Sequence, residues 1–231
     1  MHMVSNKLRF ISNRVIEPIA KRFAGSRVTP NQVTILGLIV MIGASAATAV
    51  VGMFKLDPVW LIVTLLLLIL SGFFDLLDGG IAKFTGRKSK FGGVLDSCCD
   101  RYADGFFILG LVFGNFLAPP AYLSHYLPDP ATWDVILGFL GLLGAYMTSY
   151  VRSRAEIESV NMAGVGWIER GERLMALTLA LVLHILLPTI GMIFYVFLVL
   201  TVLMHVTAIQ RIVHAKNELK MVDEKTKIEN N

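Results

Sequence analysis

Five aspartates in otherwise apolar stretches of the sequence are the residues whose type and spacing best suit chemistry. Asp75 and Asp78 lie three residues apart, and Asp96 and Asp100 lie four apart. Asp104 follows one helical turn later. Side chains three or four residues apart share one face of a helix, about 5–6 Å from each other. Two antiparallel helices that carry these pairs would therefore bring four carboxylates to one point.

Such a cluster predicts a site for a hard divalent cation. One aspartate in the middle of a bilayer costs about 2.5–3.5 kcal/mol, so several of them together need compensation. Mg²⁺ and Mn²⁺ prefer oxygen ligands, and paired metal ions stabilise the attacking and leaving oxygens in phosphoryl transfer. Scattered histidines form no rival site for a softer metal: they are His125, His184, His205 and His214. We therefore expect Mg²⁺ or Mn²⁺ at this cluster, and a pair of such ions would suit phosphoryl transfer.

The composition of the chain indicates that these acids lie in a membrane protein. Of its 231 residues, 55% are hydrophobic and 16% are charged, and the mean hydropathy is +0.66. These values exclude a disordered chain, a fibrous protein and a nucleic-acid-binding tail. A helix needs about 20 apolar residues to cross a bilayer, and the chain has room for six such helices. The apolar runs lie near residues 32–54, 58–84, 93–118, 132–152, 171–187 and 189–210.

The predicted fold is an all-α integral membrane protein of six transmembrane helices, preceded by an interfacial amphipathic helix. Apolar residues recur within residues 1–28 at three- and four-residue spacing, with basic residues between them. This stripe consists of Val4, Leu8, Ile11, Val15, Ile19 and Phe23. A solvated helix packed on the protein is the alternative. Residues 29–216 form the predicted six-helix domain, and residues 217–231 form a charged C-terminal tail that we expect to be frayed.

Capping residues and prolines mark the expected helix ends. Thr29-Pro30 and Asp57-Pro58 each place a capping side chain before a proline, which favours the start of a helix. Pro119-Pro120 and Pro188 are expected to end other helices. These signals separate the apolar runs from one another.

The basic residues predict which side of the membrane each end occupies. If the N-terminus lies inside, 20 of the 21 lysines and arginines fall on inner segments, and Lys55 alone falls outside. Short cytosolic loops retain positive charge, so both termini are expected in the cytosol. Asp75 lies about 26 Å of helix from Pro58, and Asp100 about 28 Å from Pro119, against a hydrocarbon core of about 30 Å. The active site of a multi-pass protein of the cell membrane is therefore expected at the cytosolic boundary.

The acidic segment resembles the signature of the CDP-alcohol phosphotransferases, D-x2-D-G-x2-A-R-x8-G-x3-D-x3-D. The sequence reads Asp75-Leu-Leu-Asp78-Gly79-Gly-Ile-Ala82-Lys83, then eight residues, then Gly92-Gly-Val-Leu-Asp96-Ser-Cys-Cys-Asp100. Every spacing of this 26-residue pattern agrees. The Thr29-Pro30-Asn31 opening of the first span and the six-helix length are also similar to this family. Lys83 departs from the family arginine, because lysine offers a point charge where arginine offers a bidentate fork.

The resemblance implies a reaction in which the hydroxyl of an acceptor displaces CMP from a CDP-lipid. It implies Asp75, Asp78 and Asp96 as metal ligands. Asp100 would be the general base that takes the acceptor proton, while also touching a metal ion. The implied CDP-lipid-binding residues are Asn31, Asp75, Asp78, Gly79, Ala82, Lys83, Gly86, Ser89 and Gly92. The implied lipid is CDP-diacylglycerol or CDP-archaeol, between which the sequence does not discriminate, and the implied oligomer is a homodimer.

Two further segments narrow the acceptor. Tyr150-Val-Arg152-Ser-Arg154-Ala-Glu156 and Ile168-Glu169-Arg170-Gly-Glu172-Arg173-Leu174 resemble segments of the phosphatidylinositol-phosphate synthases and the archaetidylinositol phosphate synthases. Those enzymes use myo-inositol phosphate, and several arginines at one depth suit a phosphate dianion. The expected acceptor-binding residues are Arg101, Arg152, Arg154, Arg170 and Arg173. The alternative is that the arginines anchor inner loops or pair with Glu156, Glu158, Glu169 and Glu172.

Three other functions are alternatives on the sequence alone. A phosphatidylglycerophosphate-type synthase would use glycerol phosphate as the acceptor. An intramembrane prenyltransferase also holds a diphosphate with aspartate-bound magnesium, but it spreads its acids over two halves of a longer chain, whereas here they lie within residues 75–104. A membrane cation transporter would place acids across the membrane rather than at one boundary. Membrane lipids are expected partners, and nucleic acid is not.

Overall fold

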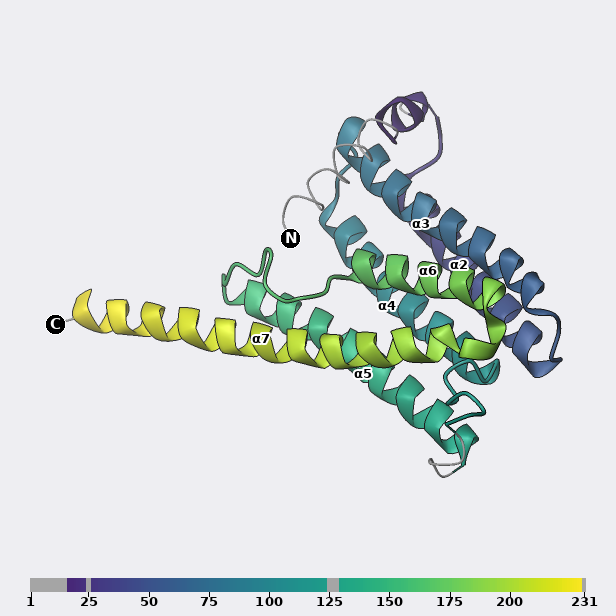
Figure 1. The fold of residues 1–231 in the computed structure, drawn as a ribbon. Helices are drawn as coiled ribbons and strands as arrows, with labels where there is room; N and C mark the ends of the chain where they lie inside the picture. Colours follow the sequence, from purple (N-terminus) through teal and green to yellow (C-terminus); the bar gives the residue numbers. More distant parts are fainter. Residues whose placement is uncertain (1–15, 24–25, 124–128, 230–231) are drawn as a thin grey trace. The chain divides into compact units, whose positions relative to one another are not determined.

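Helices account for the regular secondary structure of the described residues. The computed structural model describes residues 16–23, 26–123 and 129–229, and within these ranges it has helices and turns but no strand. Helix α2 comprises Pro30–Met53, α3 Leu61–Phe84, α4 Lys90–Phe113, α5 Pro130–Ile157, α6 Arg170–Leu186 and α7 Met192–Glu229, and residues 16–22 form a further helix (Figure 1). The 3₁₀ helices η1 (Pro58–Trp60) and η2 (Pro188–Ile190) precede α3 and α7. The predicted all-α class is confirmed.

Four helices in the described part of the chain are long and apolar enough to cross a membrane. They are Pro30–Met53, Pro58–Phe84, Pro130–Ile157 and Met192–Val222. Helices α4 and α6 occupy the third and fifth predicted spans, but α4 carries Asp96, Asp100 and Asp104, and α6 has only 17 residues. Helix α4 is thus more charged, and helix α6 shorter, than the four long apolar helices. The chain is a multi-pass membrane protein, as predicted.

The residues before the helices use the capping chemistry that the sequence indicates. Thr29 caps α2, because its hydroxyl accepts a hydrogen bond from the backbone N–H of Gln32. The Gln32 side chain in turn accepts one from the N–H of Thr29. Asp57 accepts a hydrogen bond from the N–H of Val59 at 2.9 Å. These bonds satisfy N–H groups that lack a partner inside the helix, and both predicted caps are confirmed.

The chain forms two compact units, residues 1–115 and residues 116–231. In the first unit, α2 contacts both α3 and α4 (Figure 1). Small residues permit the contact with α4, since a Cβ on Gly110 would lie 2.5 Å from the carbonyl oxygen of Ser45 and 2.7 Å from its hydroxyl oxygen. The Ser45 hydroxyl also donates a hydrogen bond to the carbonyl of Phe106. Packing and interhelical hydrogen bonds of this kind hold membrane helices together.

The helix over residues 16–22 packs against α3. Ile16 and Ala20 are buried in one apolar cluster with Leu77 and Ile81. A Cβ on Gly80 would lie 2.3 Å from the Ile16 side chain, so this glycine makes room for the helix. The most buried positions thus lie beside the predicted apolar stripe, because the buried face is rotated by about one residue. Of that stripe, Ile19 and Phe23 pack at the edge of the cluster, while Val4, Leu8, Ile11 and Val15 lie outside the described residues.

In the second unit, α7 contacts both α5 and α6. A Cβ on Gly141 would lie 2.3 Å from the ring of Phe197, and α5 therefore receives α7 of the same chain at this glycine. The segment before α5 is anchored by the buried carboxylate of Asp134, which accepts a hydrogen bond from the N–H of Leu117 at 2.7 Å. Gly141, in the fourth predicted span, thus serves packing within the chain.

Helix α7 continues to Glu229, whereas the sequence predicts a frayed tail over residues 217–231. Residues 217–229 contain no glycine or proline and are rich in lysine and glutamate. Such residues favour the helical conformation, and nothing in this stretch stops the helix. A charged composition predicts that a segment is exposed to solvent, but charge does not by itself end a helix.

Replacing Gly110 by alanine is expected to weaken the packing of α2 on α4. The added Cβ meets backbone atoms of Ser45, and overpacking of this kind costs about 1–3 kcal/mol. Gly72→Ala is the matched control, because a Cβ at Gly72 meets nothing within 4 Å and alanine favours a helix. Thermal unfolding in detergent should give a lower midpoint for Gly110→Ala and an equal or higher one for Gly72→Ala. Equal midpoints for the two variants would contradict the close contact.

Candidate functional site

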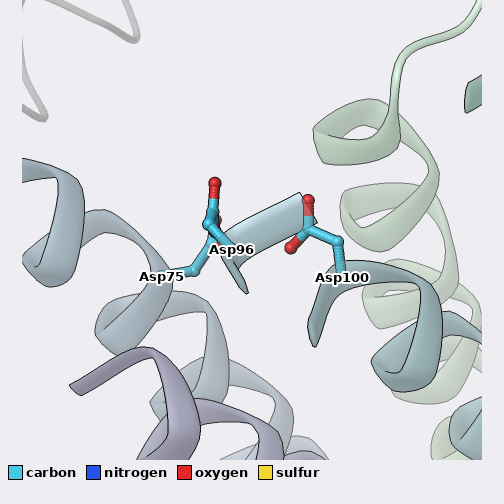
Figure 2. Close-up of side chains that lie close together, drawn as sticks. All are labelled: Asp75, Asp96 and Asp100. Atoms are coloured by element: carbon cyan, nitrogen blue, oxygen red, sulfur yellow. The ribbon is translucent and has the colours of Figure 1, made fainter. Parts of the chain in front are cut away.

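Three of the predicted metal-binding aspartates converge between α3 and α4. Carboxylate oxygens of Asp75, Asp96 and Asp100, one from each residue, all lie within 4.8 Å of one another. Asp75 comes from α3, Asp96 and Asp100 come from α4, and the three side chains extend into the same space (Figure 2). Asp75 is exposed and the other two are partly exposed. We call these three residues the carboxylate trio. Their exposure makes the trio accessible to ligands.

Asp78, the fourth predicted ligand, is buried beside the carboxylate trio and contacts α2. The residue is 6% exposed. Its Oδ2 accepts a hydrogen bond from the hydroxyl of Thr34 at 2.5 Å. Asp75 and Asp96 lie close enough to act on it electrostatically. The structure therefore gathers three of the four predicted ligands at one point and holds the fourth next to them.

The donor set fits a divalent cation such as Mg²⁺ or Mn²⁺. Carboxylates gathered this closely repel one another, and a bound cation relieves that repulsion. Metal–oxygen distances of about 2.0–2.6 Å allow two oxygens on one ion to lie at most about 4–5 Å apart. The trio, with oxygens within 4.8 Å of one another, is at this limit, and small side-chain rotations would close it. Among the described residues the group contains no histidine or cysteine, which favours a hard metal over a soft one.

The glycines near the acids differ in what surrounds them. A Cβ on Gly79 or Gly93 would meet no atom within 4 Å, so both residues leave open space on the helices that carry the trio. Gly80 instead makes room for Ile16 and serves the packing of the N-terminal helix. Space for a ligand is therefore a better explanation for Gly79 and Gly93 than for Gly80.

Three of the predicted CDP-lipid-binding residues meet where α2 and α4 begin. A Cβ on Gly92 would lie 3.0 Å from Ser89 Oγ and 3.2 Å from Asn31 Oδ1. Ser89 also caps α4, because its hydroxyl accepts a hydrogen bond from the N–H of Gly92 at 2.9 Å. A hydroxyl and an amide thus lie close together at the glycine, although Asn31 is far from the other two in the sequence.

The remaining predicted CDP-lipid-binding residues lie at the end of α3 and in the turn that follows. Ala82 is partly buried, and Lys83 is exposed with its Nζ 5.0 Å from the centroid of the Phe84 ring. Gly86 has a φ of +69°, a conformation that favours glycine. The lysine thus keeps its positive charge near the surface at the end of the acidic helix.

Arg87, which the sequence does not predict for the site, connects this turn to the chain before α2. Its Nη1 donates to the carbonyl oxygens of Ser26 at 3.3 Å and Val28 at 3.1 Å. The turn between α3 and α4 is therefore tied to the segment that leads into α2.

Arg101 lies beside the predicted general base. Its Nη1 is 3.7 Å from Asp100 Oδ2 and donates a hydrogen bond to the carbonyl of Ser97 at 2.6 Å. Asp104, one turn further along α4, is partly buried and does not belong to the carboxylate trio. The structure therefore places Arg101, which was predicted to bind the acceptor phosphate, next to Asp100.

Two of the predicted acceptor-binding arginines in the second unit form exposed ion pairs at the end of α5. Arg152 Nε is 2.9 Å from Glu156, and Arg154 Nη1 is 2.7 Å from Glu158. Pairing with these glutamates is the alternative to acceptor binding that we considered for the two arginines. Arg170, by contrast, is the first residue of α6 and is partly buried.

A pair of buried arginines meets at Thr148. Arg173 is 6% exposed and Arg211 is 4% exposed. Arg211 Nη1 donates to the Thr148 carbonyl at 2.6 Å, and Arg173 Nη1 lies 3.4 Å from the Thr148 hydroxyl. Sequence reasoning missed Arg211, because the last apolar run ends at residue 210 and a basic residue there is explained by the inside location alone. These two guanidinium groups form a positive centre within the second unit.

The connection between α5 and α6 is fixed on α7. The Thr207 hydroxyl accepts hydrogen bonds from the N–H groups of Trp167 and Ile168, at 3.2 Å each. Arg211 Nε also donates a hydrogen bond to the carbonyl of Val165 at 2.9 Å. A Cβ on Gly166, whose φ is +113°, would lie 2.3 Å from the Thr207 side chain. Helix α7 therefore positions the backbone that leads into Arg170 and Arg173.

Known proteins resemble this chain over most of its length. A family model described as CDP-alcohol phosphatidyltransferase matches residues 27–216. An archaetidylinositol phosphate synthase of Pyrococcus horikoshii is 35% identical over 94% of this chain and 98% of its own. The crystal structure of Mycobacterium tuberculosis phosphatidylinositol phosphate synthase with CDP-DAG bound has a TM-score of 0.68 and 26% identity, covering 87% of this chain and 94% of that one. The same synthase in complex with manganese and citrate has a TM-score of 0.69 and 26% identity, covering 87% and 88%.

Replacing Asp75 or Asp96 by asparagine is expected to weaken Mn²⁺ binding by the purified protein. A neutral amide cannot replace a charged oxygen ligand for a hard cation, and loss of even an outer hydrogen-bonding partner costs about 10- to 100-fold in affinity. Asp57→Asn is the control, because that carboxylate caps η1 and lies outside the trio. Electron paramagnetic resonance measures free Mn²⁺ during the titration. Unchanged affinity in both trio variants would contradict a metal site here.

Proposed function

Because the chain belongs to the CDP-alcohol phosphatidyltransferase family, we propose that it transfers a diacylglycerol- or archaeol-phosphate group from a CDP-lipid to myo-inositol phosphate and releases CMP. The family predicted from the acidic segment is confirmed. The observation that carries the reaction is the meeting of Asp75, Asp96 and Asp100 within 4.8 Å. The names of the relatives, archaetidylinositol phosphate synthase and phosphatidylinositol phosphate synthase, support the choice of acceptor.

The acidic site would bind the diphosphate of the CDP-lipid through divalent metal ions. Two Mg²⁺ or Mn²⁺ ions, when bound, supply positive charge that stabilises the diphosphate oxygens. The residues that would hold them are Asp75, Asp78, Asp96 and Asp100, as predicted from the sequence. The crystallisation of a related synthase with manganese supports this choice.

Polar groups around Gly92 would orient the cytidine diphosphate. Asn31 and Ser89 face the position of a Gly92 Cβ at 3.2 Å and 3.0 Å, so glycine lets a ligand approach these groups closely. Gly79 leaves space on the other helix. The positive charge of Lys83 favours a diphosphate, although it lacks the fork of the family arginine.

Asp100 would act as the general base. The acceptor hydroxyl oxygen attacks the β-phosphorus of the CDP-lipid and forms a new O–P bond. The bond between that phosphorus and the bridging oxygen breaks, and CMP leaves with the electron pair. A carboxylate oxygen of Asp100 takes the hydroxyl proton. Arg101 Nη1 lies 3.7 Å from Asp100 Oδ2, so a positive charge lies next to the proposed base.

We expect six membrane spans, with α4 and α6 as the third and fifth, and with both termini and the active site on the cytosolic side of the cell membrane. The location of 20 of the 21 lysines and arginines on one side of such a topology supports it. The helix over residues 16–22 would lie at the cytosolic interface. Its buried Ile16 and Ala20 and its exposed Glu17–Lys21 ion pair of 2.6 Å are consistent with an amphipathic helix.

The positive centre of the second unit supports a phosphorylated acceptor. Arg173 and Arg211 are buried around Thr148, and charge-assisted hydrogen bonds from arginine suit phosphate oxygens. Arg152, Arg154 and Arg170 would add positive charge at the ends of α5 and α6. We therefore add Arg211 to the acceptor-binding arginines expected from the sequence.

Release of labelled CMP by the purified protein tests the proposed function. The acceptors to compare are inositol phosphate, glycerol phosphate, inositol and serine, each with CDP-diacylglycerol and with CDP-archaeol. We expect release with inositol phosphate alone. Release with glycerol phosphate instead would indicate the phosphatidylglycerophosphate-type reaction. No release with any acceptor would contradict the transferase.

Asp100→Asn should reduce turnover by about 10²- to 10⁴-fold, because it removes the group that takes the acceptor proton. CDP-lipid binding, measured by thermal stabilisation, should largely survive. Asp104→Asn provides a comparison one turn further along α4, with the same loss of charge outside the trio, and should lose far less activity. Turnover by Asp100→Asn above a tenth of the wild-type rate would rule out its role as the base.

Arg173→Lys should raise the KM for inositol phosphate by about 10- to 100-fold, since one charge-assisted bond is worth about 1.5–3 kcal/mol. The charge is kept but the bidentate fork is lost. The KM for CDP-lipid should change much less. Lys216→Gln, a loss of one positive charge elsewhere on α7, serves as the control. Parallel loss of acceptor use and CDP-lipid binding by Arg173→Lys would show that this arginine maintains the fold instead.

A further inference from the structure

Thr34 reaches the acidic site from α2, a helix that contributes none of the carboxylate trio. Its hydroxyl donates a hydrogen bond to Asp78 Oδ2 at 2.5 Å. The same oxygen lies 3.1 Å from the carbonyl of Pro30. A hydroxyl has a single proton, and its contact with the Asp78 carboxylate is the shorter of the two. Thr34 therefore donates chiefly to Asp78.

The backbones of α2 and α3 approach closely enough for a short side chain to make this bond. A Cβ on Gly37, one turn after Thr34, would lie 3.2 Å from Phe74 Cβ. The Ser71 hydroxyl donates to the Gly37 carbonyl at 2.9 Å. These contacts fix α2 against α3 next to the acids. The position of the Thr34 hydroxyl is thus determined by helix packing and not by a flexible loop.

We propose that Thr34 is a positioning residue for the metal site, whose hydroxyl holds one oxygen of Asp78 and leaves the other to bind the divalent ion. This inference rests on the proposed role of Asp78 as a metal ligand. Asp78 is 6% exposed and lies near Asp75 and Asp96, which repel its charge. A buried carboxylate in that setting needs a hydrogen-bond donor to keep its orientation before the cation binds. Carboxylates that bind metals generally have such partners.

If Thr34 had a purely structural role, its hydrogen bond would only join two helices. The chain contains another threonine on α2 whose hydroxyl does this, and it serves as a comparison. The Thr48 hydroxyl lies 3.2 Å from the Thr64 hydroxyl, and this contact also joins α2 to α3. Both threonines are fully buried, and neither belongs to the carboxylate group. Thr34→Val and Thr48→Val therefore remove the same chemical group from the same helix pair, and only the first change touches a carboxylate.

The experiment is a Mn²⁺ titration of the full-length protein in detergent, followed by electron paramagnetic resonance. The variants are Thr34→Val, Thr34→Ser, Thr48→Val, Asp78→Asn and the Thr34→Val/Asp78→Asn double variant. We expect Thr34→Val to weaken Mn²⁺ binding by about 10- to 100-fold. Thr34→Ser, which restores the hydroxyl, and Thr48→Val should stay within about threefold of wild type. Thermal unfolding without metal shows whether each variant is folded, and Thr34→Ala replaces Thr34→Val if the latter is not.

The double variant distinguishes action through Asp78 from other effects. If Thr34 acts by holding Asp78, replacing Thr34 should weaken Mn²⁺ binding little further once Asp78 is asparagine. A further tenfold loss in that background would overturn the proposal, and so would equal effects of Thr34→Val and Thr48→Val. If Asp78→Asn loses Mn²⁺ affinity and Thr34→Val does not, the role of Thr34 alone is overturned. Unchanged Mn²⁺ affinity in Asp78→Asn would instead overturn the ligand role of Asp78 in the proposed function, and the role of Thr34 with it.

Discussion

Repulsion between carboxylates at one end of apolar helices is the constraint on which the first unit depends. The trio lies within 4.8 Å, and Asp78 is buried close to it, so these charges oppose the approach of α3 to α4. The packing of α2 against both helices resists that repulsion. Gly110 accommodates Ser45 on one side of α2, and Gly37 approaches Phe74 on the other. A divalent cation bound by the trio would offset the remaining repulsion between the carboxylates.

Features encoded by local spacing could be predicted from the sequence. The pairs Asp75/Asp78 and Asp96/Asp100 were expected to share helix faces, and three of the four carboxylates do converge. Thr29 was expected to cap the first long helix and does so. Periodicity, capping residues and short motifs act over a few residues, and for this reason the helices and the centre of the acidic site could be located without coordinates.

Features that depend on contacts between distant residues could not be predicted. Thr34 and Asp78 are 44 residues apart, and an isolated threonine in an apolar helix gives no sign of its partner. Arg211 follows an apolar run, where a basic residue is expected for reasons of topology alone. Gly80 belongs to the acidic motif by position but to the packing of Ile16 by contact. In each case the missing information is which helix face meets which neighbour, and this is set by the packing of the whole unit.

The connection between α5 and α6 should tolerate changes in length poorly, unlike most surface loops. Its N–H groups at Trp167 and Ile168 are bonded to Thr207, and its carbonyl at Val165 is bonded to Arg211. An inserted residue between this anchor and α6 would turn the helix by about 100° and move Arg173 off the face that meets Thr148. Natural variants that keep the buried arginines should therefore vary in the composition of this loop while keeping its number of residues.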